Sequence, residues 1–491
     1  MLSNSRCRAF VFLVIPTVMS ACTEEGLLAD ADRHLNGFRC DVVQVITEYA
    51  DDSHDEFFSC IDSPVRLQLD PEFEREHWDL LVSGHATLDI DRSLSEIDGG
   101  APLEASEIAI AESFQPAAST DSSKFGESSV LVVRVDTPDS THPTDEAEMS
   151  ANVFGGPDDQ VNLKSQIDGC SHGKKTIVPV DVPGHPPGVL TAAVDLIAAD
   201  HDSGDLANAA AELARIQLGL DEPVESTYDH VMYMIPPGSK NPFTAWAYSG
   251  AARSVYNVER SSFPRTQAHE IGHNMGLGHS GLGEDKYADK SGNMGGCNGD
   301  DDHDEATKKC FNAARSSQLG WYADKEVTIE AGTIGEYELV GVEDYPRASE
   351  SQQVLLQLVA PDGSRVLHVA YNAGHGPNEG THHTGERVTV VDQKLPIGAP
   401  SYRLAALTED SEPFVIESFA GSGQTVAIKV LERTIGGQEV DSARLRVTYT
   451  GDDDGCEDFC RAGQDQTCAC MLLLCSEQGM CCDYDVGCPR W

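Results

Sequence analysis

Alternation of apolar and polar residues predicts a strand-rich segment near the N-terminus. Between residues 30 and 105, apolar side chains take every second position in short runs, which places them on one face of a strand. These runs are residues 41–47, 65–69 and 86–90. Residues 100–127 are rich in Ser, Ala, Glu and Pro, a composition that predicts a linker.

The central region mixes strand and helix patterns. Strand patterns occur at residues 129–135, 189–196, 230–235 and 244–248. Helical spacing occurs near residues 144–154 and again at 205–220, where apolar residues recur on one face. The mixture predicts an α+β domain over residues 128–325.

Beyond this region the pattern changes to strands alone. From residue 326 to 450, strands alternate with Gly and Pro turns about every 8–12 residues, a rhythm that predicts a β-sandwich. A short segment then holds eight cysteines: Cys456, Cys460, Cys468, Cys470, Cys475, Cys481, Cys482 and Cys488. So small a segment buries little apolar surface, so we expect disulfides to be its main support; a metal-binding cluster is the alternative.

The first 21 residues have the pattern of a signal peptide. Arg6 and Arg8 precede an apolar run over residues 9–18, shorter than the roughly 20 residues of a transmembrane helix. The following MSAC, residues 19–22, is similar to a bacterial lipobox, in which Cys22 becomes the lipidated first residue. Ordinary cleavage nearby is the alternative. We expect an extracytoplasmic protein, secreted or anchored by lipid at the cell surface or outer membrane, with no other membrane contact.

The net charge of the chain excludes one class of binding partner. The 491 residues include 34 Lys and Arg against 81 Asp and Glu, a net charge of −47. This charge repels phosphates, so we expect no nucleic-acid partner, and it favours solubility. Fifteen cysteines are many for a reducing compartment, which agrees with export.

The strongest chemical signal is HEIGHNMGLGH, residues 269–279. Residues four apart on a helix share a face, so His269 and His273 can hold one ion. Gly276 can end the helix in a left-handed conformation, and the turn then returns His279 as a third ligand. Three imidazoles leave one position of a zinc ion open, as catalysis requires.

Glu270 lies beside the first of these histidines and can reach the open position. Zinc lowers the pKa of a bound water from about 15.7 towards 7. Glu270 would take a proton from this water as it attacks a peptide carbonyl, and would then pass the proton to the leaving amine. Surface histidines scattered on a helix are the alternative.

The eleven-residue run resembles that of the metzincin metallopeptidases, which also have a methionine turn beneath the metal. Residues 287–296, YADKSGNMGG, resemble this turn, with Met294 as the base of the site. Other metzincins place a tyrosine two residues after the methionine, where this chain has Gly296. Tyr287 would assist instead, or only pack against the site.

Other runs are similar to the gametolysin family, the autolysin-like peptidases of algal cell walls and their bacterial relatives. They are VNLKSQ at 161–166, CSHGK at 170–174, CFNAA at 310–314 and QLGWY at 318–322. The resemblance implies a secreted zinc endopeptidase that acts on proteins, including matrix or cell-wall glycoproteins. It also implies a pro-segment, for which residues 22–127 are the candidate; a permanent domain is the alternative. His269, His273 and His279 match the family's ligands, and Glu270 matches its catalytic acid/base.

The remaining cysteines allow several pairings. Cys40 and Cys60 would form a disulfide; alternatively, Cys40 would act as a cysteine switch whose thiolate ligates the zinc. Cys310 would pair with Cys297 or with Cys170. The order of the eight cysteines in residues 456–488 resembles a somatomedin-B domain, which implies a domain that binds a protein or matrix ligand.

Two acidic runs remain. Asp300, Asp301 and Asp302, with Asp304 and Glu305, would bind Ca²⁺ or, more simply, form a solvated loop. We interpret the run at residues 51–56 in the same way.

Together these patterns predict a multidomain protein with an α+β metzincin catalytic domain. Its parts are a signal peptide (1–21), a β-rich pro-segment and linker (22–127), the catalytic domain (128–325), a β-sandwich (326–450) and a disulfide-rich domain (456–488). The rival function is a non-catalytic surface adhesion protein that keeps this fold. A second rival is a zinc enzyme that acts on a non-peptide bond.

Overall fold

The computed structural model describes most of the chain between residues 38 and 450. The described residues are 38–49, 53–61, 63–84, 86–93, 97, 102–113, 124–156, 161–296, 308–381, 384–394, 398–436 and 440–450. Five predictions lie outside them: the signal peptide at 1–21, the lipidated Cys22, the cysteine at 297, the acidic run at 300–305, and the cysteine-rich segment at 456–488.

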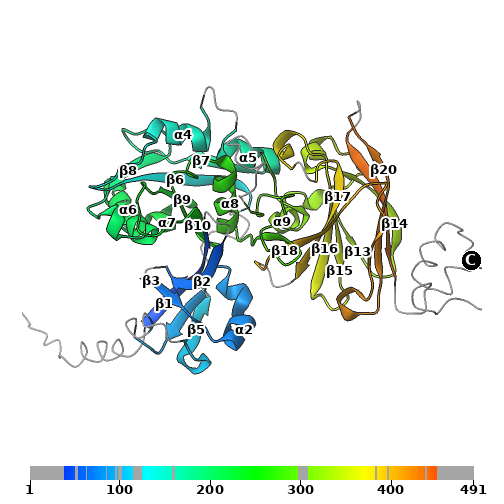
Figure 1. Ribbon diagram of the computed structural model, residues 1–491, viewed down its shortest axis with the longest axis horizontal. Helices are drawn as coiled ribbons and strands as arrows, with labels where there is room; N and C mark the ends of the chain where they lie inside the picture. Colours follow the sequence, from blue (N-terminus) through cyan, green and yellow to red (C-terminus); the bar gives the residue numbers. More distant parts are fainter. Residues whose placement is uncertain are drawn as a thin grey trace, which may run out of the picture.

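The described N-terminal residues form twisted strands with helix α2 packed beside them (Figure 1). Its elements are β1 (Phe38–Glu48), β2 (His54–Cys60), β3 (Ser63–Leu67), α2 (Pro71–Leu81), β4 (Ala86–Ile90), η1 (Ala105–Glu107) and β5 (Ile108–Ser113). The strand prediction is confirmed for β1, β3 and β4, but helix α2 was not predicted. The linker prediction was wrong for residues 108–113, because β5 pairs there with β4.

Helix α2 has a local cause in the sequence. The Asp70 side chain accepts hydrogen bonds from the backbone N–H groups of Glu72 and Phe73, which have no partner inside the helix. Pro71 occupies the first helical position, where its fixed φ suits the helix and its missing N–H costs nothing.

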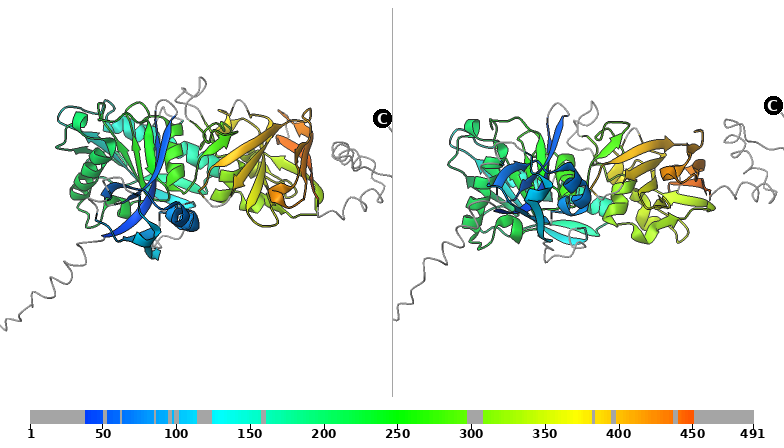
Figure 2. Two further views of the ribbon diagram at one scale, coloured as in Figure 1. Left: turned by 60° about the horizontal axis from the view of Figure 1, so that its bottom comes forward. Right: turned by 90° about the horizontal axis from the view of Figure 1, so that it is seen from below.

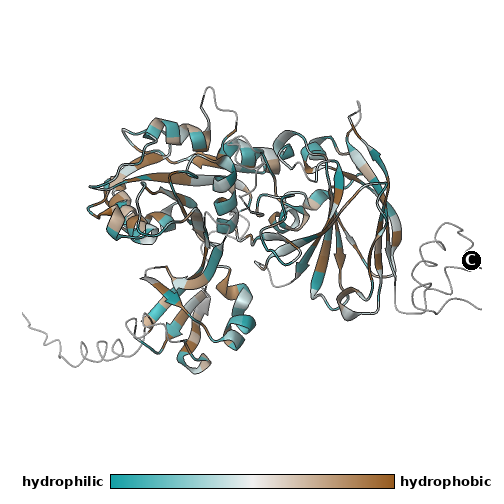
Figure 3. Ribbon diagram, viewed as in Figure 1, coloured by the Kyte–Doolittle hydropathy of each residue, from teal (hydrophilic) through white to brown (hydrophobic). Residues whose placement is uncertain are grey.

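The central region has strands flanked by helices, as predicted. Its elements are β6 (Gly126–Asp136), α4 (Glu146–Phe154), α5 (Leu163–Ser171), β7 (Lys175–Pro179), β8 (Val189–Ala193), η2 (Ala198–Asp200), α6 (Ser203–Leu218), α7 (Val224–Thr227), β9 (His230–Met234), β10 (Ala245–Tyr248), β11 (Arg253–Tyr256), α8 (Pro264–Asn274), β12 (Ser280–Leu282), α9 (Ala313–Leu319) and η3 (Ala323–Lys325). Apolar residues concentrate along the strands (Figure 3). Val130, Val132 and Met232 on these strands are fully buried.

The N-terminal and central strands join in one sheet. Strand β6 is parallel to β7, β8 and β9, and β11 is parallel to β9. Strand β10 is antiparallel to β11, and its other side pairs with β1. Among the described residues this makes an 11-stranded sheet, in which β1 extends from the N-terminal segment to pair with β10 of the central region (Figures 1 and 2).

The C-terminal region contains strands, as the pattern predicted, and also short 3-10 helices, which it did not predict. Its elements are β13 (Glu326–Ile329), β14 (Ile334–Val340), η4 (Val342–Arg347), β15 (Leu355–Val359), β16 (Arg365–Asn372), η5 (Gly376–Asn378), β17 (Arg387–Lys394), β18 (Ser401–Leu407), β19 (Phe414–Ile416), η6 (Phe419–Gly421), β20 (Val426–Thr434) and β21 (Ser442–Tyr449). Two sheets share one hydrophobic cluster, with Leu358 and Val390 on one sheet and Val430 and Leu445 on the other. Strand β12 of the central region pairs with β18, so the first of these sheets reaches the residue that follows the motif at 269–279.

Two disulfides connect described residues. Cys40 pairs with Cys60, as predicted, and joins β1 to β2. Cys170 pairs with Cys310, which settles one open alternative and ties α5 to the segment before α9. Among the described residues, no helix combines the length and the hydropathy that a membrane-spanning helix requires.

Candidate metal centre and active site

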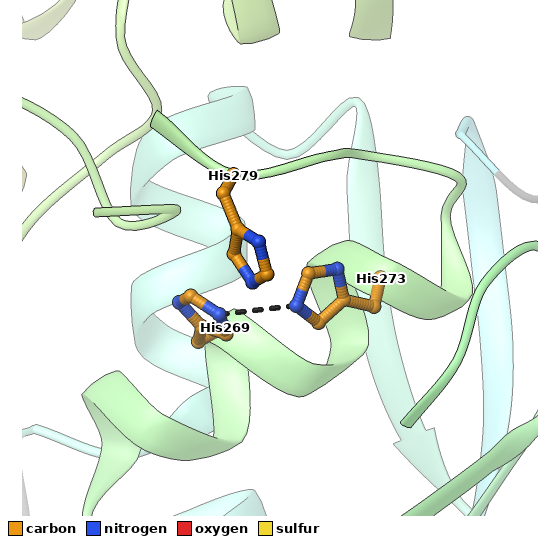
Figure 4. Close-up of side chains that lie close together, drawn as sticks. All are labelled: His269, His273 and His279. Carbon is orange, nitrogen blue, oxygen red and sulfur yellow. Dashed lines mark hydrogen bonds between the residues drawn. The ribbon is translucent and has the colours of Figure 1, made fainter. Parts of the chain in front are cut away.

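Helix α8 and the turn after it bring three histidines together. The helix begins at Pro264, ends at Asn274 and is buried along its whole length. Gly276 adopts a left-handed φ of 80°, as predicted, so the chain reverses without the strain that a side chain would cause there. His279 thereby returns to face His269 and His273, and the three rings point toward one another (Figure 4).

Hydrogen bonds fix which nitrogen of each helical imidazole faces the centre. His269 Nδ1 lies 2.8 Å from the Asn293 carbonyl, and His273 Nδ1 lies 2.8 Å from the Leu277 carbonyl. Carbonyls only accept, so both Nδ1 atoms carry the proton and both Nε2 atoms present lone pairs. These Nε2 atoms are 3.1 Å apart. Two lone pairs at this distance repel unless a cation lies between them.

The three-histidine group fits a zinc ion. Nitrogen ligands about 2.0–2.1 Å from a tetrahedral zinc lie about 3.3 Å from one another, close to the separation of the two helical nitrogens. One ligand atom from each of His269, His273 and His279 lies within 4.8 Å of the others. His279 Nε2 is buried and has no hydrogen-bond partner among the described residues. The residues present therefore suit a metal with nitrogen ligands.

Glu270 is buried beside this group. Its side chain is fully covered, and neither carboxylate oxygen has a hydrogen-bond partner in the part of the chain that the structure describes. Burial, followed by the negative charge of Glu48, raises the pKa of Glu270 well above its ordinary value. A buried carboxylate without partners is costly unless a cation or water accompanies it, which agrees with a metal site at this position.

Met294 lies under the helix that carries the first two histidines. It is fully buried, and its carbonyl accepts a hydrogen bond of 2.8 Å from the backbone N–H of Ser280, the residue after His279. Its neighbour Asn293 holds His269 through the carbonyl described above. The methionine turn thus supports two of the three histidines, His269 by a side-chain bond and His279 through the backbone.

Close packing between Gly272 and Met294 allows a test of the contact between α8 and the methionine turn. A Cβ atom at Gly272 would lie 2.4 Å from Met294 Sδ and 3.3 Å from a ring carbon of Phe311. We expect Gly272→Ala to lower the free energy of unfolding by about 1–3 kcal/mol through overpacking, measured by chemical denaturation. In a Met294→Ala background the same substitution should cost less, because the sulfur is gone. Equal costs in both backgrounds would contradict the contact.

The last residue of β1 reaches the histidines. Glu48, the last residue of β1, is 6% exposed, and its Oε1 lies 2.9 Å from His269 Nε2 and 4.0 Å from His279 Nε2.

The cysteine-switch prediction for Cys40 was wrong. Cys40 is bound to Cys60, so its sulfur is not a free thiolate. Cys40 and Glu48 also lie eight residues apart on one strand, which separates them by about 26 Å at 3.3 Å per residue. The residue that β1 brings to the histidines is a glutamate.

The second strand of the hairpin contacts the third histidine. Glu56 Oε1 lies 3.2 Å from His279 Nδ1 and 2.5 Å from Lys286 Nζ. The solvated-loop interpretation of residues 51–56 was therefore wrong for Glu56. Tyr287 packs its ring 3.9 Å from that of His279, between centroids, and the ring of His54 packs on Tyr287 in turn. Tyr287 thus has the packing role that was one of its two alternatives.

Buried polar groups hold the segment around His279 from the C-terminal side. Arg315 is fully buried and donates 2.9 Å to the carbonyl of His279 and 2.5 Å to that of Ala399. Asp289 is buried at the methionine turn and accepts from Arg403 at 2.8 Å. The eleven-residue run at 269–279 revealed none of these contacts, because Arg315, Asp289 and Arg403 all lie outside it.

Comparison with known proteins finds a family match over the central region. Residues 133–346 match the family model described as gametolysin peptidase M11. The match includes the three histidines and Glu270, and it supports a peptidase of the gametolysin kind in this part of the chain. No curated protein matches the chain.

Two solved structures are distantly similar. Both are crystal structures of wild-type OgpA from Akkermansia muciniphila, in different crystal forms. One has 11% identity and a TM-score of 0.28, covering 65% of this chain and 93% of that chain. The other has 10% identity and a TM-score of 0.28, covering 62% and 88%. A TM-score this low carries neither fold nor function to the present chain.

Proposed function

We propose that this protein is a secreted or surface-anchored zinc metalloendopeptidase with a metzincin-type catalytic domain. The observation that carries the proposal is the convergence of three imidazole Nε2 atoms beside the buried carboxylate of Glu270. The turn at Gly276 and the methionine beneath α8 support the metzincin layout. His269, His273 and His279 would hold the zinc, and Glu270 would be the acid/base.

The chemistry of hydrolysis follows from this set. Zinc, when bound, supplies a Lewis acid that lowers the pKa of water and polarises a carbonyl. Glu270 accepts a proton from the attacking water while a C–O bond forms at the peptide carbonyl. The peptide C–N bond then breaks, and Glu270 donates that proton to the leaving amine nitrogen. The carbonyls of Asn293 and Leu277 keep His269 and His273 in the tautomer that faces the reaction.

Proteins or peptides are the substrates that such a site would take. An extended peptide can add to an exposed sheet edge through its backbone, and β10 is the strand of the central sheet next to the helical histidines. Matrix or cell-wall glycoproteins remain the implied source of such chains.

The proposal is tested by zinc content and zinc-dependent cleavage. The full chain, in its native form and as Glu48→Gln, is dialysed, analysed for zinc and incubated with casein. The Glu48→Gln form is included because Glu48 Oε1 lies 2.9 Å from His269 Nε2. A site that Glu48 covers is then not mistaken for an inactive site. We expect about one zinc per chain and casein cleavage that 1,10-phenanthroline abolishes and added zinc restores.

Other results would favour the rival functions. A protein that holds no zinc and is inert in both forms favours the adhesion protein. Zinc-dependent cleavage of esters or small amides, with casein untouched, favours an enzyme of a non-peptide bond.

A further inference from the structure

We propose that Glu48 is a fourth ligand of the metal in the full-length chain, so that the β1–β2 hairpin keeps the peptidase latent. The inference rests on the proposed function and deepens it, because it names the group that controls access to the same site. It assigns to a carboxylate the role that the sequence had offered to the Cys40 thiolate.

Strand β1 occupies the edge where a substrate would bind. It pairs antiparallel with β10, with Val45 opposite Tyr248 and Glu48 opposite Ala245. Backbone hydrogen bonds at both ends complete the pairing. The Thr244 N–H donates a hydrogen bond of 2.8 Å to the Glu48 carbonyl, and the Ser249 N–H donates one of 2.9 Å to the Gln44 carbonyl. A peptide that adds to β10 must therefore first displace β1.

The Glu48 carboxylate lies where a ligand of the metal would lie. Its Oε1 is 2.9 Å from His269 Nε2, close to the 3.1 Å between the two helical nitrogens. Glu48, His269 and Glu270 each offer an atom within 4.8 Å of the others, and all three are buried. The carboxylates of Glu48 and Glu270 together carry two negative charges, which balance one divalent cation held by neutral imidazoles. Without a cation, two buried carboxylates this close would repel each other.

Contacts on both sides hold the hairpin in place. Glu56 on β2 contacts both His279 and Lys286, so a second carboxylate anchors the hairpin to the last histidine and to its neighbouring loop. The Cys40–Cys60 disulfide ties the strands at the opposite end. The backbone N–H of Tyr49 donates 2.9 Å to the Ser53 carbonyl, which closes the tip. These two bonds hold β1 and β2 to each other, so less conformational entropy is lost when Glu48 binds the metal.

The test uses the full chain with cobalt in place of zinc, because the visible spectrum of cobalt reports its ligands directly. Three proteins are compared: native, Glu48→Gln, and Glu76→Gln. Glutamine keeps the size of the side chain but removes its charge. Glu76 is an exposed residue of α2 in the same segment and is the matched control. Thermal unfolding of each form checks that the hairpin domain is folded.

We expect the cobalt spectrum of Glu48→Gln to differ from that of the native protein, and that of Glu76→Gln to match it. The rate of casein cleavage should rise about ten- to hundredfold in Glu48→Gln, because this factor corresponds to the loss of one charge-assisted contact. The rate should not change in Glu76→Gln. Binding of acetohydroxamate, a small metal ligand, should tighten in Glu48→Gln alone.

The outcomes separate this inference from the proposed function. Bound cobalt with identical spectra in native protein and Glu48→Gln overturns the role of Glu48 and leaves the zinc site standing. Failure of all three proteins to bind cobalt overturns the zinc site itself, and the fourth ligand with it. If Glu48→Gln is unfolded, Glu48→Asp replaces it, since its shorter side chain would no longer reach the metal. A cobalt spectrum of Glu48→Asp that matches the native one again overturns Glu48 as a ligand.

Discussion

Replacing Glu270 with glutamine is expected to lower kcat/KM for peptide hydrolysis by about 10²–10⁴-fold. Glutamine fills the same buried space, but its amide cannot take a proton from water or return it to the amine. Zinc content should stay the same, because the three imidazoles remain. The comparison is made in the full chain with Glu48 and again with Glu48→Gln, so that latency does not hide the effect.

The matched control for this change is Glu212→Gln. Glu212 lies on α6, where its carboxylate pairs with Arg215 at the surface. We expect native activity from this variant. Full activity in Glu270→Gln would contradict the catalytic assignment, whereas loss of both activity and zinc would show that Glu270 holds the metal centre together.

Replacing His273 with alanine is expected to weaken zinc binding by more than about a hundredfold, since partners outside the ligand shell alone account for 10–100-fold. His273 provides one of three nitrogens, and its removal also frees the Leu277 carbonyl. The measurement is zinc retained per chain after dialysis against a graded series of chelator concentrations.

His185→Ala is the control for general histidine binding. His185 is exposed and contacts Glu146, far along the chain from the motif. Its zinc retention should equal that of the native protein. Equal retention in His273→Ala would place the metal elsewhere.

The three-histidine motif was predictable because all its information is local. The helix period brings His269 and His273 to one face, and glycine at 276 provides the φ of 80° that the return of His279 requires. Each step depends on residues at most a few positions apart. Helix α2 was equally local, with Asp70 and Pro71 at its start, and closer attention to that signal would have found it.

The hairpin contacts were not predictable because they depend on pairing between distant strands. Glu56 and His279 are 223 residues apart, and no spacing rule connects them. Glu48 ends an ordinary alternating strand, so its pattern resembles that of any strand end. An acidic run normally indicates a solvated surface, and only the register of β2 against β1, with Glu56 opposite Ile46, places Glu56 at the site.

The support from the C-terminal region was hidden for the same reason. Arg403 belongs to β18 and Asp289 to the methionine turn, 114 residues away. Parallel pairing of β12 with β18 brings them together. The region predicted as a separate β-sandwich therefore also braces the segment that carries His279. Burial lowers the pKa of Arg315, on α9 of the central region, to about 9.

The central claim is that this chain hydrolyses peptide bonds with water at the three-histidine site. The most direct measurement is casein digestion by the zinc-loaded Glu48→Gln chain in ¹⁸O-labelled water, followed by mass spectrometry of the peptides. The account predicts new C-termini that carry ¹⁸O, and at least about a hundredfold fewer of them when Glu270→Gln is added to the same chain. An absence of new termini from the zinc-loaded protein, or equal labelling with Glu270→Gln, would contradict it.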